Sequence, residues 1–131
     1  MIALDTNVLV RHVVQDDPVQ SAKASRAIAK LTPENRGFIA MVVLCELLWV
    51  LKSAYNIPKS DCVSLFEHIL EASDFEIERG DLCRRALREF AGGKADFCDY
   101  LIRELATASG CSVVLSFDQA ALESTGFEAP G

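Results

Sequence analysis

Two periods of apolar residues run along the chain, and together they predict an α/β protein. Apolar runs at residues 2–5, 37–40 and 112–117, with an alternating run at 75–78, predict strands. Apolar residues at helical spacing predict helices from Asp17-Pro18 to about residue 31, over 42–55, around 63–70, from Asp81 to about residue 90, and over 95–108. Strands that alternate with helices favour a mostly parallel sheet between helical layers.

Residues that typically begin or end helices stand at the ends of these segments. Asp17 can cap a helix that has Pro18 in its first turn, and Gly92-Gly93 and Gly110 interrupt later helices. The run at 2–5 lacks a polar face, which is typical of central strands in a parallel sheet. With no linker, low-complexity tract or internal repeat, residues 1–131 are expected to form one domain.

Composition and charge narrow the function classes. Half of the 131 residues are hydrophobic and 24% are charged, as in an ordinary globular domain, and the formal net charge is -6. An acidic chain is a poor general binder of nucleic acid, because affinity for phosphates comes mainly from Lys and Arg. It does not exclude a nucleic-acid enzyme, because bound metal ions reverse the sign of a carboxylate-rich site.

Cysteine spacing and hydropathy suggest where the protein works. The five cysteines form no Cys-x-x-Cys pair and are expected to be small buried hydrophobes in a reducing cytosol. With only two histidines, a zinc site is not expected. No basic region precedes the first apolar run, and the longest apolar stretch, 38–51, is shorter than the ~20 residues of a membrane span. We therefore expect a cytoplasmic protein with no membrane partner.

Acidic residues stand where the predicted strands end. Asp5 and Asp118 each follow a strand, and ligands of an open parallel sheet bind beyond the C-terminal ends of its strands. Glu46 is the only ionisable residue in the stretch MVVLCELLWVL, so we expect it to be buried and paired or metal-bound. Asp96 and Asp99 are three residues apart, which puts them on one face of a helix.

Each acid also has a structural explanation. Asp5 and Asp118 could be helix N-caps, Asp96 could be a first-turn acid favoured by the helix dipole, and Asp99 could be solvated. The combination is more specific, because acids from distant segments would converge on one sheet edge. Two carboxylates ~4 Å apart repel by about 4 kcal/mol at an effective dielectric of 20. Mg²⁺ or Mn²⁺ would relieve that repulsion, and such ions can activate water and hold a phosphodiester.

Four sequence motifs occur in the following order along the chain: LDTNVLVRHVVQDDP, VVLCELLWVL, GGKADFCDYLI and SFD. Together they resemble a PIN-domain ribonuclease of the VapC-like toxin class in type II toxin–antitoxin systems, and the likeness covers essentially the whole chain. It implies a three-layer α/β/α sandwich and a metal-dependent endoribonuclease that uses Mg²⁺ or Mn²⁺. It also implies a homodimer and a small antitoxin partner that blocks the site.

The resemblance assigns roles residue by residue. The catalytic acids would be Asp5, Glu46, Asp96 and Asp118, and the metal ligands Asp5, Asp96, Asp99 and Asp118. Thr6, Asn7 and Ser116 would support them, with Thr6 and Asn7 capping the helix that follows Asp5. Two departures are visible: Ser116 stands where Thr is usual, and Met41 stands where a Ser or Thr cap would begin the helix of Glu46.

Basic residues near these acids are sparse. Arg11 and Lys94 are candidate contacts for an RNA phosphate, and Arg84, Arg85 and Arg88 form a basic cluster on one predicted helix. Solvated surface charge is the other interpretation of each.

Two other classes begin similarly. A phosphatase of the haloacid dehalogenase type needs a second Asp two residues after the first, and Asn7 stands there. A receiver-like domain needs adjacent acids after its first strand and a late lysine. A catalytically degenerate PIN-like or receiver-like binding module remains the alternative, and metal-dependent hydrolysis of RNA separates it from the enzyme.

Overall fold

A computed structural model describes all residues from Met1 to Gly131, and they form two compact units, Met1–Gly80 and Asp81–Gly131. Every pair of strands within them is parallel, and seven helices accompany the strands. This confirms the predicted α/β class with a parallel sheet. That residues 1–131 act as one domain stays a prediction.

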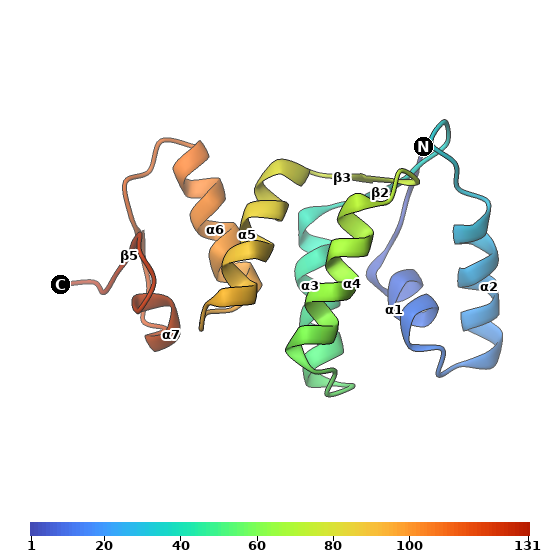
Figure 1. Cartoon of the computed structure of the whole chain (residues 1–131), viewed down its shortest axis with the longest axis horizontal. Helices are drawn as coiled ribbons and strands as arrows, with labels where there is room; N and C mark the ends of the chain where they lie inside the picture. The colour runs from blue at the N-terminus through green and yellow to red at the C-terminus, as the bar shows by residue number, and fades with distance from the viewer. The chain divides into compact units, whose positions relative to one another are not determined.

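The first unit is built on a three-stranded parallel sheet in the order β1-β2-β3. Two of these strands, β2 and β3, are labelled in Figure 1. The strands are β1 (Ile2–Ala3), β2 (Gly37–Ile39) and β3 (Phe75–Ile77), with Ile2 opposite Gly37 and Gly37 opposite Phe75. Helices α1 (Thr6–Val14) and α2 (Pro18–Ala29) connect β1 to β2, and α3 (Met41–Ser53) and α4 (Lys59–Glu71) connect β2 to β3. Fully buried side chains of β2, α3 and α4 form the core: Ile39, Leu44, Leu47, Leu51 and Phe66.

The second unit pairs helices with a short two-stranded parallel sheet. It contains α5 (Gly80–Gly92), α6 (Phe97–Ala108), β4 (Val114–Leu115), α7 (Gln119–Leu122) and β5 (Phe127–Glu128). Val114 lies opposite Phe127. The rings of Phe90 on α5 and Phe97 on α6 meet edge to face with centroids 6.4 Å apart, and both side chains are buried, as is Tyr100.

Helix starts follow the sequence signals in most places. Asp17 caps α2, because its Oδ1 accepts hydrogen bonds from the backbone N–H groups of Val19 and Gln20 (3.1 and 2.9 Å), and Pro18 lies in the first turn. Asp81 differs from the prediction: α5 begins at Gly80, so this acid lies in the first turn instead of at the cap. Strand β5 of the second sheet and the short helix α7 show no clear hydrophobic pattern in the sequence, and neither was predicted.

The first and last apolar runs contribute only two residues each to their sheets, and that the run at 2–5 is a central strand stays a prediction. The run at 2–5 contributes only two residues to β1, which pairs with β2 alone, and Ile2 is 55% exposed. The run at 112–117 contributes β4, where Leu115 is 61% exposed. Each strand pairs on one side only within its own sheet, so its other edge is not covered there.

Two remaining predictions concern the burial of the cysteines and the lack of a membrane span. All five cysteines are free thiols; Cys62 and Cys83 are buried, whereas Cys111 is exposed. The expectation of uniformly buried cysteines is therefore right for two of the five. None of the seven helices has the length and apolar character needed to cross a membrane.

Candidate active site

Asp5 ends the first strand and begins the first helix. It is the N-cap of α1, with its Oδ1 accepting a hydrogen bond from the backbone N–H of Thr6 at 2.8 Å. The predicted capping role of Thr6 and Asn7 is therefore wrong, because both lie inside the helix. Thr6 is buried and its Oγ1 has no hydrogen-bond partner, whereas Asp5 and Asn7 are exposed.

Glu46 lies in the second turn of α3 and is exposed. The prediction that it is a buried carboxylate is wrong. Helix α3 buries one stripe, made by Val43, Leu44, Leu47, Leu48 and Leu51, and the opposite stripe carries Val42, Glu46 and Trp49 outward. Sequence alone suggested burial on all sides because every neighbour of Glu46 is apolar.

The start of α3 is held by an acid that the sequence did not suggest. Its N-cap residue Ala40 makes no side-chain bond, and the carboxylate of Glu78 accepts a hydrogen bond from the backbone N–H of Met41 at 3.0 Å. Glu78 follows β3, and its own N–H donates to the carbonyl of Ile39. No local pattern could reveal this cap, because 37 residues separate the two partners.

Topology brings Asp5, Glu46 and Glu78 to the same end of the first sheet. The backbone N–H of Leu4 donates to the carbonyl of Phe38 at 2.9 Å, so β1 and β2 run in register up to the residues that begin α1 and α3. These two helices contact each other. The first unit therefore presents carboxylates at the C-terminal edge of all three strands, where parallel sheets place their sites.

Asp96 and Asp99 face each other at the start of α6, as their spacing predicted. Asp96 is the N-cap, and its backbone N–H donates a hydrogen bond to the Oδ2 of Asp99 at 3.3 Å. Asp96 is exposed and Asp99 half-buried. The preceding Ala95 is buried and donates its N–H to the hydroxyl of Tyr100 at 3.4 Å, which ties the segment to the core of the unit.

Asp118 begins α7, with its Oδ1 accepting a hydrogen bond from the backbone N–H of Ala121 at 2.9 Å. Ser116, the residue that departs from the usual Thr, accepts the backbone N–H of Asp118 on its Oγ at 3.0 Å. A serine hydroxyl is sufficient to form this turn. Hydrogen bonds therefore hold both the backbone N–H and the carboxylate of Asp118.

Three acids of the second unit lie close enough to affect one another. Burial raises the pKa of Asp99, and the negative charges of Asp118 and Asp96 raise it further, while the hydrogen bond from the Asp96 backbone opposes the shift. Such crowding of carboxylates is relieved by a bound cation, and oxygen-only donors suit Mg²⁺ or Mn²⁺. The chemistry of these donors suits a hard divalent ion, although within neither unit does a group of three or more His, Cys, Asp or Glu side chains lie in a position to hold one.

Helix capping and metal binding were alternative explanations of these acids, and the structure is compatible with both. Asp5, Asp96 and Asp118 are all helix N-caps. A carboxylate has two oxygens and about four lone-pair positions, so accepting one N–H leaves room for a metal or a water molecule. Capping therefore does not exclude a catalytic role, and it fixes where each carboxylate points.

The candidate RNA contacts are both in ion pairs. Arg11 pairs with Asp16 at 3.0 Å, and Lys94 pairs with Glu123 at 3.3 Å, although the Lys94 side chain is 78% exposed. In the basic cluster on α5, Arg85 lies 4.0 Å from Glu104.

Comparison with known proteins identifies the family. No curated protein matches the chain in sequence. The family model for the PIN domain matches residues 2–128, nearly the whole chain. PIN domains are generally nucleases with an α/β/α fold, which agrees with the parallel strands, the flanking helices and the acids at their ends. The chain therefore belongs to the PIN-domain family.

Proposed function

We propose that this protein is a metal-dependent endoribonuclease and the toxin of a type II toxin–antitoxin system. The observation that carries the proposal is the crowding of Asp96, Asp99 and Asp118 in a chain of the PIN family. Repulsion between close carboxylates destabilises a fold, and a bound cation would offset that repulsion. A carboxylate site with a divalent ion is suited to hydrolysis of phosphodiesters.

The proposed roles follow from how each acid is held. Asp5, Glu46, Asp96 and Asp118 act as the catalytic acids, and Asp5, Asp96, Asp99 and Asp118 are the metal ligands. A bound Mg²⁺ or Mn²⁺ supplies a Lewis acid that activates water and neutralises phosphate charge. The capping bonds to Thr6 and Ala121 orient Asp5 and Asp118, and Ser116 fixes the turn before Asp118.

The direct test is hydrolysis of RNA by the purified chain. We expect cleavage of single-stranded RNA in Mg²⁺ or Mn²⁺, no cleavage in EDTA, and recovery when the ion is added back. Sequencing the 5′ ends of the products would identify the target. Cleavage that persists in EDTA would contradict the metal, and none with any divalent ion would leave the binding-module alternative.

A small antitoxin is the proposed protein partner. An acidic site attracts an Arg or Lys side chain, which can form charge-assisted hydrogen bonds with carboxylates and displace a cation. We expect a small protein to co-purify from the native host and to suppress cleavage. Recovery of the chain alone under conditions that preserve complexes would contradict this.

A homodimer is the second proposed partner state. On α3, Val42 and Trp49 are 63% and 70% exposed and lie on one stripe of the helix with Glu46. Exposed large apolar side chains on one helix face are a frequent feature of protein interfaces. Sedimentation equilibrium at micromolar concentration should give a dimer, and Trp49→Glu should give a monomer. A wild-type monomer throughout would refute the proposal.

The remaining assignments are narrower. Arg11 and Lys94 are proposed RNA contacts, and Lys94 directly precedes the Ala95-Asp96 segment. Cytoplasmic location is proposed because the five cysteines are free thiols and the substrate is RNA.

A further inference from the structure

A groove of about 520 Å³ lies between α1 and α2 in the first unit. Four of its seven lining residues are polar, and the others are small or apolar: Asn7, Val8, Arg11, Gln20, Lys23, Ala24 and Ala27. Two of them are cations and none is an acid. In a chain with a formal net charge of -6, this is a locally basic surface.

The groove begins beside the first candidate acid. Asn7 is two residues after Asp5, and Arg11 lies one turn further along α1. The rise from Asn7 to Arg11 is about 6 Å along the helix axis. A chain of phosphates lying in the groove would therefore extend away from the carboxylate that ends β1.

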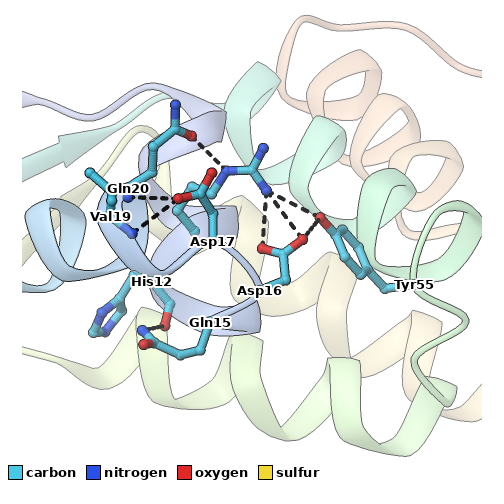
Figure 2. Close-up of polar contacts among 8 residues, drawn as sticks. His12, Gln15, Asp16, Asp17, Val19, Gln20 and Tyr55 are labelled. Carbon is cyan, nitrogen blue, oxygen red and sulfur yellow. Dashed lines mark hydrogen bonds and ion pairs between the residues drawn. The ribbon is translucent and has the colours of Figure 1, made fainter.

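Arg11 lines the groove and bonds to neighbours on three segments, Asp16, Gln20 and Tyr55, which are labelled in Figure 2. Its Nε donates to Gln20 at 2.8 Å, and its Nη1 donates to Asp16 at 3.0 Å and to the hydroxyl of Tyr55 at 3.3 Å. Asp16 offsets much of its charge. Arg11 therefore shapes the groove more than it charges it.

Lys23 is the cation of the groove that makes no ion pair. It is exposed on α2, and Gln20, Lys23 and Ala27 are spaced three and four residues apart, so they share the face toward α1. Small Ala24 and Ala27 leave the space open, which a larger side chain would fill. An uncompensated ammonium beside amide groups is suited to a phosphodiester backbone, which offers negative charge and hydrogen-bond acceptors at regular spacing.

We propose that the α1–α2 groove binds the sugar–phosphate backbone of the single-stranded RNA that flanks the cleaved bond, with Lys23 as its phosphate contact. This rests on the proposed ribonuclease activity and adds to it a substrate-binding site outside the acids. Lys23 touches no reacting atom, so it contributes to binding of the substrate and not to the chemical step.

The test compares Lys23→Gln with Lys30→Gln in the full-length chain. Lys30 is also exposed but lies at the end of α2, outside the groove. Binding of a fluorescent single-stranded RNA is measured by anisotropy in EDTA, where cleavage is absent, over a range of salt concentrations. Cleavage kinetics are measured separately in Mg²⁺.

We expect Lys23→Gln to weaken RNA binding severalfold at low salt, regardless of RNA sequence. The slope of log affinity against log salt should fall in magnitude by about 0.7, the value for one phosphate contact on a single strand. In the cleavage assay KM should rise severalfold with kcat unchanged. Lys30→Gln should resemble the wild type in every measurement.

A second pair of variants distinguishes RNA binding in the groove from a general attraction of RNA to positive surface charge. Ala27→Leu fills the groove without changing charge, and Ala22→Leu makes the same change on an exposed position of α2 away from it. We expect weaker RNA binding from Ala27→Leu only. If both Lys variants bind alike, or if Ala27→Leu binds normally, the groove does not hold RNA, and a protein segment becomes its better occupant.

The outcomes separate this inference from the proposed function. Wild-type cleavage together with unaffected binding by Lys23→Gln and Ala27→Leu overturns the groove alone. Wild-type protein that binds RNA through the groove but cleaves nothing overturns the ribonuclease alone. Wild-type protein that neither binds nor cleaves RNA overturns both.

Discussion

Asp5, Asp96 and Asp118 are helix caps in the structure and also the proposed ligands of a metal ion. Each caps a helix, and the bonds of Asp5 to Thr6 and of Asp118 to Ala121 use a single carboxylate oxygen. Asn caps a helix about as well as Asp, whereas Ala loses about 1 kcal/mol. Replacement by Asn therefore removes the charge and keeps the cap, which separates the two roles experimentally.

The cysteines should differ sharply in reactivity. Burial raises the pKa of the Cys62 thiol, so at pH 8 less of it is the reactive thiolate, and reagents cannot reach it in the folded chain. Cys111 is exposed. We expect an aromatic disulfide reagent to modify Cys111 rapidly and Cys62 only on unfolding, as read by mass spectrometry. Rapid labelling of Cys62 in the native protein would show that the core around α4 is open.

The Asp16 carboxylate makes the stability of the first unit depend on acid. The hydrogen bond from the Tyr55 hydroxyl at 2.8 Å, then a backbone hydrogen bond at Asp16 itself and the charge of Arg11, lower its pKa below the ordinary value of 3.8. A lowered folded-state pKa stabilises the fold above the unfolded pKa and ceases to do so as the pH falls through the folded value.

Removing the Tyr55 hydroxyl should therefore have an effect that depends on pH. We expect Tyr55→Phe to unfold at lower urea concentration than the wild type at pH 7, because it deletes the largest cause of the Asp16 shift. The gap should narrow as the pH falls below 3.8, where Asp16 becomes protonated in both proteins. A gap that is constant from pH 7 to pH 2 would assign the loss to packing of the ring instead.

At the scale of elements, sequence patterns located helices better than strands. Asp17-Pro18 set the start of α2, and the apolar periodicity placed α3 within two residues of its observed ends. The strands are two or three residues long, too short for a period to be reliable. The cap that Glu78 provides for α3 comes from a distant segment, which no local rule detects.

The end of α5 gives a matched pair of glycine substitutions. A Cβ on Gly93 would overlap the hydroxyl of Tyr100 and lie 2.8 Å from the carbonyl oxygen of Glu89, whereas a Cβ on Gly92 meets nothing within 4 Å. Tyr100 is buried and also bonds Ser124 at 3.0 Å, so it cannot move freely.

Alanine should therefore be tolerated at one position and not at its neighbour. We expect Gly93→Ala to lower the free energy of unfolding by about 1–3 kcal/mol through overpacking. Gly92→Ala, at the last residue of α5, should be neutral or stabilising by up to about 1 kcal/mol. Urea denaturation measures both. Equal stability of the two variants would show that Tyr100 yields at little cost.

At the scale of the whole molecule, the sequence motifs indicated the family but not the surroundings of the acids. The order of four motifs indicated a PIN domain, which the match over residues 2–128 confirms. Burial of Glu46 was misjudged because hydrophobic neighbours in sequence do not determine which stripe of α3 faces inward. The roles of the individual acids stay predictions, because they depend on a metal and a substrate.

The measurement that tests the central claim most directly is RNA cleavage by Asp5→Asn, paired with thermal unfolding. The matched control is Asp61→Asn, the same change at an exposed acid in the first turn of α4. Asn keeps the α1 cap, so both variants should melt close to the wild type in EDTA. Excess Mg²⁺ should raise the melting temperature of the wild type and of Asp61→Asn, and that of Asp5→Asn much less.

The account predicts that Asp61→Asn cleaves RNA like the wild type and that Asp5→Asn does not cleave it at all. Cleavage by Asp5→Asn at the wild-type rate would show that the proposed site is wrong. A melting temperature for Asp5→Asn several degrees below the wild type in EDTA would show that the charge of Asp5 stabilises the metal-free fold, which contradicts the account that this charge serves the metal.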